Sequence, residues 1–315
     1  MEGSCASTID TRVVYGFKDA GKTSYIRDCI INDYFYKYGT TLVLCFQRGQ
    51  EVFDAEILRK RNAFAAYYDG VQDIKEFCLE QIMKYNPDRI YAEMNTNIPD
   101  IRAMFPEVMN VTFTVTLFDW TTFDWYYTCF KQLISQMVSE SQQVTFRGCP
   151  SKELLSPYAQ EFWLMNHKAS YLRQDPMGYH EKAFDLFVPY SLEEKSITIS
   201  EKEYLIFWLD AADHPEHYDG KQIIFKDPLE LRQMEENPPW YAGRVVMTCC
   251  MADLQFMSFE LKGSGAEGLH GGWAALKASG TIGTDKYGQK KPLLEVESIN
   301  YMAAPKAGGI LQPGK

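Results

Sequence analysis

The sequence lacks a long apolar run, because none of its hydrophobic stretches approaches the ~20 residues that a helix needs to cross a bilayer. Its start, MEGSCASTIDTRVV, also lacks the basic segment, apolar core and small-residue cleavage site of a secretory leader. These two absences predict a cytoplasmic protein that does not itself span a membrane.

An excess of basic side chains is also missing, since 42 acidic residues outnumber 32 basic ones and give a net charge of -10. A surface of this average charge repels phosphate backbones. The sequence also has no basic stripe interleaved with aromatic residues, the pattern typical of single-strand binding. We therefore expect no nucleic-acid partner.

A spaced cysteine pattern is absent as well. The eight cysteines include several inside apolar stretches, where a reduced cysteine behaves as a small hydrophobic residue, so we expect no disulfide framework. Apolar material is abundant, at 46% hydrophobic and 14% aromatic residues, and is sufficient for packed cores. A length of 315 residues fits about two domains of ~150 residues each.

The first half of the chain alternates β-rich runs with helical stretches, which predicts an α/β fold with a doubly wound, mostly parallel sheet. In such sheets ligands bind beyond the carboxyl ends of the strands. The expected strands are residues 12–15, 41–46, 89–93, 111–118 and 143–146. The expected helices are residues 22–35, 52–61, 74–85 and 125–139.

The second half shows short strand-like runs between Gly, Pro and Asp turns: SITI, KQIIF, GRVVMTCC, LQFMSFEL, GWAALKASGTI and PLLEVESI. This pattern predicts a small all-β domain, most simply a five-stranded barrel like that of oligonucleotide/oligosaccharide-binding (OB) domains. We place the first domain with its linker at residues 1–195, the β domain at 196–302 and a flexible tail at 303–315.

The clearest motif is G-x-x-x-x-G-K-[ST], the Walker A pattern, which residues 16–23 match as GFKDAGKT. It stands between an expected strand and an expected helix. There, glycines let backbone N–H groups wrap around a phosphate, and the helix offers its positive N-terminal end. Lys22 can reach the outer phosphates and Thr23 can hold Mg²⁺. The predicted nucleotide-binding residues are Gly16, Asp19, Ala20, Gly21, Lys22, Thr23 and Ser24.

A nucleotide site also needs a carboxylate at the end of a neighbouring strand, to orient the metal or the attacking water. Glu93 ends RIYAE and Asp119 ends VTFTVTLFD, so Thr23, Glu93 and Asp119 are the predicted Mg²⁺ residues. For both carboxylates the alternative is a helix cap or turn acceptor. Lys22 and Glu93 are the predicted catalytic residues.

The string VVYGFKDAGKTSYI resembles the start of the CobW-like P-loop GTPases, relatives of the nickel-insertion GTPases of hydrogenase and urease maturation. The likeness extends through RIYAEMNTNIPD, VTLFDWTTFDWYY and QVTFRGC and covers residues 11–165. The stretches GRVVMTCCMADLQFMSFEL and GWAALKASGTI resemble an uncharacterised small β domain found in bacterial proteins linked to permeases. The first resemblance implies binding of GTP or ATP with Mg²⁺, and metal handling or metal insertion into a partner.

The chain departs from this family at three places. The stretch at residues 62–77 lacks the family's C-x-C-C metal motif, Thr96 stands where a glycine would sense the γ-phosphate, and residues 147–150 (RGCP) replace the guanine-reading N-K-x-D. We therefore expect weak nucleotide switching and little discrimination between GTP and ATP, with no metal-transfer site in the nucleotide domain.

Cys249, Cys250 and Asp253 offer two thiols and a carboxylate within one short turn, a set suited to zinc or another soft metal. His214 and His217 could complete the set, although both also fit a solvated loop. The alternative for the cysteines is one residue in the barrel core and one partly exposed, because adjacent strand residues point to opposite faces.

These observations predict a nucleotide-binding protein with slow Mg²⁺-dependent hydrolysis of a nucleoside triphosphate. Its β domain would contact a metalloprotein or membrane-protein partner. The alternative is a non-catalytic adaptor, in which a degenerate nucleotide fold supports a β interaction domain.

Overall fold

The computed structural model describes residues 8–98, 100–184, 188–234, 239–247, 254–266, 268–285, 287–305 and 309–311. The chain divides into two compact units. Unit 1 comprises Met1–Ser156 and Lys168–Phe184, and unit 2 comprises Pro157–His167 and Asp185–Lys315. The domain limits predicted at residues 195 and 302 stay predictions. Among the described residues, no helix has both the length and the apolar character that crossing a membrane requires.

Unit 1 contains an eight-stranded sheet in the order β3-β2-β4-β1-β5-β6-β7-β8. All neighbours are parallel except β7 and β8, so the predicted mostly parallel α/β sheet is confirmed. The sequence patterns missed β3, β7 and β8. The strands are β1 (Ile9–Tyr15), β2 (Thr41–Cys45), β3 (Ala63–Tyr67), β4 (Arg89–Glu93), β5 (Met109–Asp119), β6 (Gln143–Arg147), β7 (Ser170–Gln174) and β8 (His180–Lys182).

The helices of the chain are α1 (Lys22–Asn32), α2 (Ala55–Lys60), α3 (Ile74–Tyr85), α4 (Trp120–Cys129), α5 (Lys131–Ser139), α6 (Ala159–Met165) and α7 (Tyr204–Asp213). Short 3-10 helices are η1 (Phe35–Lys37), η2 (Ile101–Met104), η3 (Lys152–Tyr158), η4 (Pro215–His217) and η5 (Ser264–Ala266). The single helix expected over residues 125–139 is two helices that meet at Phe130, which caps both.

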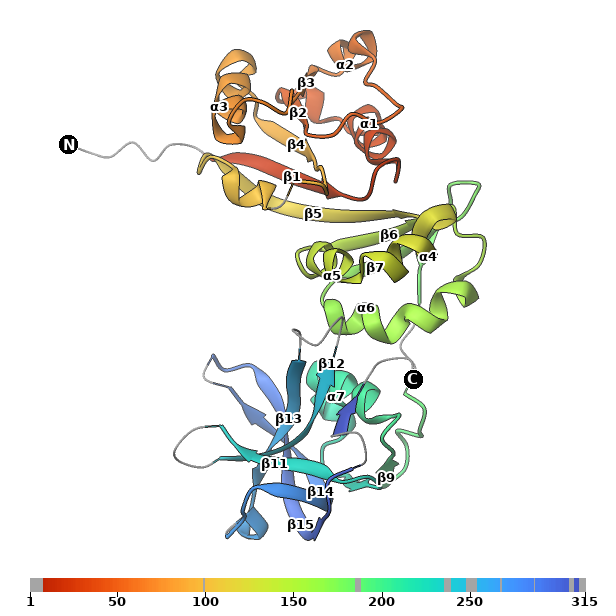
Figure 1. Ribbon diagram of the computed structural model, residues 1–315, viewed down its shortest axis with the longest axis vertical. Helices are drawn as coiled ribbons and strands as arrows, with labels where there is room; N and C mark the ends of the chain where they lie inside the picture. The colour runs from red at the N-terminus through yellow and green to blue at the C-terminus, as the bar shows by residue number, and fades with distance from the viewer. Residues whose placement is uncertain are drawn as a thin grey trace, which may run out of the picture. The chain divides into compact units, whose positions relative to one another are not determined.

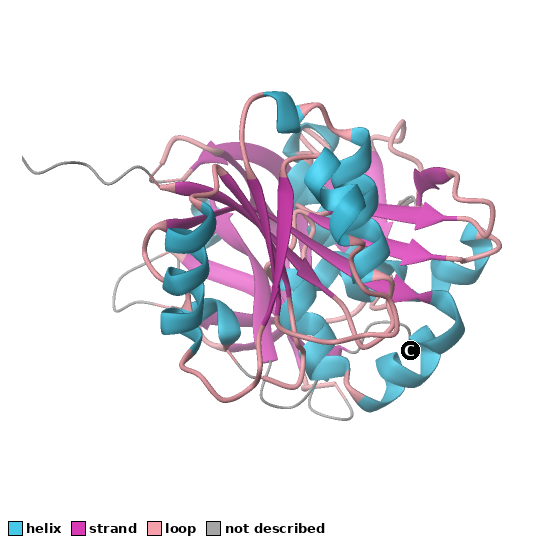
Figure 2. Ribbon diagram, turned by 90° about the horizontal axis from the view of Figure 1, so that it is seen from above, coloured by secondary structure: helices cyan, strands magenta, loops and turns pink. Residues whose placement is uncertain are grey.

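Helices cover both faces of the unit 1 sheet, because successive residues of each buried strand point to opposite sides. Val13 packs in one cluster with Phe77 of α3, whereas its neighbour Val14 packs in another with Ile26 of α1 and Leu58 of α2. Figure 1 accordingly shows α3 on one side of the strands and α1 and α2 on the other, and Figure 2 shows helices flanking the strands.

Unit 2 contains a closed five-stranded ring, in which β11 pairs with β12, β12 with β13, β13 with β15, β15 with β14, and β14 again with β11. The predicted five-stranded barrel is therefore confirmed, and its likeness to an OB domain stays a prediction. The ring consists of β11 (Leu229–Gln233), β12 (Trp240–Met247), β13 (Leu254–Lys262), β14 (Gly272–Thr284) and β15 (Lys290–Met302).

Three further strands extend the barrel. β10 (Gln222–Phe225) pairs with β14 and β9 (Ser196–Ile199) pairs with β10, so the runs KQIIF and SITI lie outside the ring. β16 (Ile310–Leu311) pairs with β12. A two-residue strand therefore lies within the segment that the sequence predicts to be a flexible tail.

The prediction of an all-β second domain missed α7. Its sequence, YLIFWLDAAD, is apolar almost all round and shows no amphipathic stripe, which is typical of a helix buried on several sides. Phe207 of α7 is 1% exposed, and its ring lies 4.8 Å from Tyr218, 5.6 Å from Phe225 and 5.1 Å from Phe259 between ring centroids. The helix is thus part of the core of unit 2.

We predict that Phe207→Ala lowers the free energy of unfolding of unit 2 by about 3–5 kcal/mol, because it removes a buried ring and leaves a cavity. Denaturant unfolding followed by circular dichroism and tryptophan fluorescence measures this change. The control is Met234→Ala, since Met234 is 53% exposed and should change stability by less than about 0.5 kcal/mol. A loss below 1 kcal/mol for Phe207→Ala would contradict the packing of α7 described above.

Candidate functional site

The loop between β1 and α1 has backbone conformations that residues other than glycine rarely adopt. Gly16, Asp19 and Gly21 have φ angles of 152°, 63° and 78°, in the left-handed region that glycine adopts most readily. A Cβ atom on Gly16 would lie 2.7 Å from the carbonyl oxygen of Leu117, so even alanine would force the loop away from β5. The two glycines of the motif are therefore required by the shape of the loop.

Gly21 is the N-cap residue of α1, and Lys22 and Thr23 form its first turn. The first backbone N–H groups of a helix have no partner within the helix, and its dipole adds positive potential at this end. This arrangement is a binding site for an anion such as a phosphate.

The Lys22 ammonium group is buried and fully occupied by oxygen atoms. Nζ donates to the carbonyl oxygens of Gly16 and Phe17 and to Oε1 of Gln47, each at 2.8 Å, and the residue is 3% exposed. Burial lowers the pKa of Lys22 to about 8, and the negative charges of Glu93 and Asp19 oppose this shift. A buried cation of this kind favours an incoming anion.

Glu93 lies beside the phosphate loop because β4 runs between β1 and β2, with Glu93 level with Val14 and Cys45. The Thr23 hydroxyl donates to Oε1 of Glu93 at 2.9 Å, and Glu93 is 3% exposed. Burial raises the pKa of Glu93, while Lys22 and the Thr23 hydrogen bond lower it and Glu51 adds a further rise.

The Thr23 and Glu93 oxygen atoms fit Mg²⁺, which prefers hard oxygen ligands in octahedral geometry. Neighbouring ligands of an ideal octahedron with bonds of 2.0–2.1 Å lie about 2.9 Å apart. The observed 2.9 Å separation of the two oxygens is therefore compatible with adjacent positions on one ion. The structure brings these two predicted residues together.

Two adjoining cavities surround the loop. One of about 150 Å³ is lined by Lys22, Thr23, Gln47 and Glu93, among others. A second of about 520 Å³ also includes Asp19, Gly21 and Glu51 in its lining and extends to the carboxyl ends of β6 and β7. A small cavity therefore lies at the charged loop, with a larger one directly beside it.

Sequence reasoning missed Gln47 and the role of Arg147. Arg147 Nη1 donates to the carbonyl oxygen of Gly21 at 2.6 Å and to Ser24 Oγ at 3.1 Å, and Nε donates to Gln174 at 2.9 Å. Arg147 thus supplies a cation at the start of α1, from the carboxyl end of β6. Both residues lie at or just beyond the carboxyl end of a strand, which is the signal that could have identified them.

Asp119 is placed differently from Glu93. Its Oδ1 accepts from the backbone N–H of Thr121 at 2.8 Å and from the Thr121 hydroxyl at 2.6 Å, so Asp119 caps α4. It lines the larger cavity, whereas Thr23 and Glu93 line the smaller one. Its role in Mg²⁺ binding stays a prediction. Cys249, Cys250 and Asp253 lie outside the described residues, so the predicted thiol site stays a prediction too.

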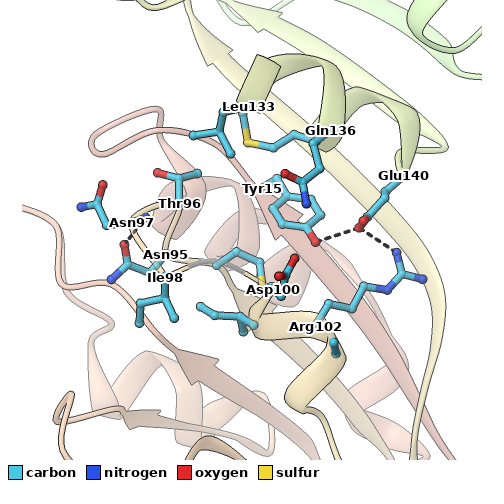
Figure 3. Close-up of a pocket in the computed structure, with 14 residues that line it drawn as sticks. Tyr15, Asn95, Thr96, Asn97, Ile98, Asp100, Arg102, Leu133, Gln136 and Glu140 are labelled. Atoms are coloured by element: carbon cyan, nitrogen blue, oxygen red, sulfur yellow. Dashed lines mark hydrogen bonds and ion pairs between the residues drawn. The ribbon is translucent and has the colours of Figure 1, made fainter. Parts of the chain in front are cut away.

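A third cavity of about 590 Å³ lies along the segment that directly follows Glu93 (Figure 3). Thr96 is in its lining, and so is Tyr15, the residue before the phosphate loop. Tyr15 donates to Oε2 of Glu140 at 2.9 Å, and Arg102 pairs with the same oxygen at 3.0 Å. Burial, with the Glu140 charge second, raises the pKa of Tyr15. This network fixes the end of β1 and leaves space beside residues 94–98.

Unit 1 thus combines a mostly parallel α/β sheet with a loop of the Walker A pattern between β1 and α1. For unit 2, the family described as the DUF1980 C-terminal domain matches residues 178–310. This match agrees with the resemblance of the β domain noted in the sequence. No curated protein matches the chain in sequence.

Several solved structures are similar to part of the chain. The hydrogenase maturation factor HypB from Archaeoglobus fulgidus is 15% identical over 54% of this chain and 82% of that chain, with a TM-score of 0.38. HypB from Helicobacter pylori in complex with nickel is 11% identical over 52% and 78%, with a TM-score of 0.35. The signal recognition particle receptor FtsY from Elizabethkingia anophelis is 10% identical over 44% and 50%, with a TM-score of 0.32. Because these likenesses are weak, we base function on this chain's own residues.

We predict that Lys22 titrates near pH 8, well below the usual value of about 10.4 for lysine. Carbon-13 NMR of the lysine side chains between pH 6 and 11 measures this, with Lys22→Arg identifying the signal. Glu93→Gln should lower the pKa of Lys22 further, because the Glu93 charge raises it. The control Asp28→Asn, on an exposed part of α1, should leave it unchanged. Titration at the ordinary lysine value would contradict the buried site.

Proposed function

We propose that unit 1 binds a nucleoside triphosphate together with Mg²⁺ and hydrolyses it slowly. The observation that carries this proposal is the convergence of the buried Lys22 ammonium and the Thr23–Glu93 oxygen pair at the start of α1, in one cavity beside the phosphate loop. Cation, hydroxyl and carboxylate are the three groups that phosphoryl-transfer sites of this class use.

Lys22 binds the outer phosphates by exchanging its present oxygen partners for phosphate oxygens. Gln47 Oε1 is the most readily exchanged, since it belongs to a side chain, whereas Gly16 and Phe17 contribute backbone carbonyls. The N–H groups at the start of α1 bind the same phosphates. Arg147 adds a positive charge beside Gly21 and Ser24.

Thr23 and Glu93 would hold Mg²⁺, which neutralises phosphate charge and polarises the bond that breaks. Glu93 also lies where a carboxylate can orient an attacking water. Catalysis in such sites depends on positioning and charge neutralisation rather than on covalent chemistry. With Thr96 in the place of a sensing glycine, we expect binding to be retained and turnover to be slow.

The cellular task that we propose is metal handling or metal insertion of the CobW-like type, acting on a metalloprotein or membrane-protein partner. This part of the proposal is supported by the resemblance of residues 11–165 to those GTPases. If nucleotide binding fails, the non-catalytic adaptor is the function that remains.

We predict that Lys22→Ala weakens Mg²⁺-nucleotide binding at least a hundredfold, because it removes the buried cation. Calorimetry with GTP and with ATP, each with Mg²⁺ and with chelator, measures this. The matched control is Lys18→Ala, since Lys18 lies in the same loop but is exposed. No Mg²⁺-dependent heat for the wild-type protein with either nucleotide would rule out the proposed function.

We also predict that affinities for GTP and ATP lie within about tenfold, or roughly 1.4 kcal/mol. Selective sites reject the wrong base by leaving buried polar groups unpaired. Here Asp175, which follows β7 and lines the larger cavity, uses its Oδ1 to accept from the backbone N–H groups of Met177 and Tyr179. Competition titration decides the matter, and a preference above about a hundredfold would show a base-reading group that this cavity does not reveal.

A further inference from the structure

A second cluster of metal-ligating side chains lies in unit 2, on the turn that follows α7. His214, Glu216 and His217 each offer one ligand atom, and these atoms all lie within 4.8 Å of one another. The two imidazole rings stack with 4.9 Å between centroids and 24° between planes. None of these residues lines the cavities of the nucleotide site.

A partly buried hydrogen-bond network orients one of the two histidines. Oδ2 of Asp210 accepts from Nδ1 of His217 at 2.9 Å and from the Tyr218 hydroxyl at 2.7 Å, and Tyr190 bonds to Tyr218 at 2.8 Å. An ionised carboxylate only accepts, so Nδ1 of His217 is the donor in this contact and Nε2 is the ring nitrogen that remains for a metal ion. A carboxylate behind the ring is the usual support of a metal-binding histidine.

The turn itself is firmly held by the core of unit 2. His217 donates its backbone N–H to His214 at 3.0 Å, closing the 3-10 turn η4. Pro215 is buried, and Tyr218 is 3% exposed and packs edge-on against Phe207 of α7. Ligands that emerge from a rigid turn lose little conformational entropy when they bind an ion.

The charge around the turn also favours a cation. Residues 210–219, DAADHPEHYD, contain four carboxylates and no lysine or arginine. Such a local excess of negative charge raises the concentration of cations near the site.

We propose that His214, Glu216 and His217 bind one divalent transition-metal ion of the Zn²⁺, Ni²⁺ or Co²⁺ class, with Asp210 as a positioning residue. Two imidazoles and a carboxylate suit these borderline metals and leave a fourth position for water or a partner's ligand. Tetrahedral ligands at 2.0–2.1 Å lie roughly 3.3 Å apart. His214 Nδ1 and Glu216 Oε1 already lie 3.4 Å apart, and all the ligand atoms lie within 4.8 Å of one another, so small side-chain movements bring the set to this spacing. The His214 side chain, which is 52% exposed, has room to move toward the His217 ring that Asp210 holds in place.

This site goes beyond the nucleotide site, because it belongs to the other unit and requires neither nucleotide nor thiols. It also differs from the predicted cysteine site, in which these histidines would only complete a thiol set. The test therefore uses the full chain with Cys249→Ser and Cys250→Ser as the background, so that the predicted thiol pair contributes nothing to the measured uptake.

The experiment titrates the chelator-stripped protein with Co²⁺, followed by its visible spectrum, and with Zn²⁺ by calorimetry. One equivalent should bind to the background protein, and His214→Ala/His217→Ala should bind it at least tenfold more weakly. The control His180→Ala/His270→Ala removes two exposed histidines outside the cluster and should bind as the background does. Circular dichroism and thermal unfolding confirm that each variant is folded.

Two single substitutions separate ligand from positioning residue. Glu216→Gln should change the cobalt spectrum, because it removes a ligand. Asp210→Asn should keep the spectrum and weaken binding about 10–100-fold, the usual effect of losing a carboxylate behind a ligating histidine. Equal metal uptake by the background protein and the His214→Ala/His217→Ala variant would overturn the proposal. Loss of uptake in the His180→Ala/His270→Ala control would overturn it too. So would an absence of binding to the background protein, in which the two cysteines are replaced.

Discussion

Burial of the Lys22 ammonium group is the constraint on which the candidate nucleotide site depends. A charged group that is 3% exposed is strongly destabilised unless oxygen atoms replace its water. The backbone conformation at Gly16 turns the loop so that the carbonyl oxygens of Gly16 and Phe17 accept from Nζ of Lys22. Oε1 of Gln47 is the third acceptor. The same burial lowers the pKa of Lys22 to about 8, because the charged form is poorly solvated there. An anionic ligand would therefore stabilise the ammonium group more than its present neutral oxygen partners do.

The strand order explains how residues far apart in sequence reach this cation. Because β2, β4 and β1 are parallel neighbours, Gln47, Glu93 and the phosphate loop all lie where these strands end, on the carboxyl-terminal side of the sheet. β6 ends on the same side of the sheet, and its last residue is Arg147. In unit 2, the core packs α7 and the turn that follows it, and this turn carries the two histidines and the carboxylate of the proposed metal site. The two sites share no residue and can be tested separately.

The sequence predicted those features of the molecule that depend on residues close together in the chain. The phosphate loop has a strict pattern of glycines and a lysine, and Glu93 ends a clearly apolar strand, so motif and strand reasoning identified both. It missed α7, because a helix buried on several sides has no amphipathic period. It also missed β3, β7 and β8 of unit 1 and β11 of the barrel, which are short runs with weak alternation. It read residues 147–150 as a lost motif, since the reach of Arg147 to Gly21 is set by the pairing of β5 with β6 and not by neighbours in sequence.

Proton uptake on nucleotide binding tests the central claim most directly. If phosphate oxygens capture Lys22, the bound ammonium stays protonated, whereas the free protein loses that proton as the pH rises through about 8. Calorimetry in buffers of different ionisation enthalpy should then show uptake of about 0.1 proton per nucleotide at pH 7, about 0.5 at pH 8 and about 0.9 at pH 9. Uptake near zero at all three pH values, with binding intact, would show that Lys22 is not the group that receives the phosphates.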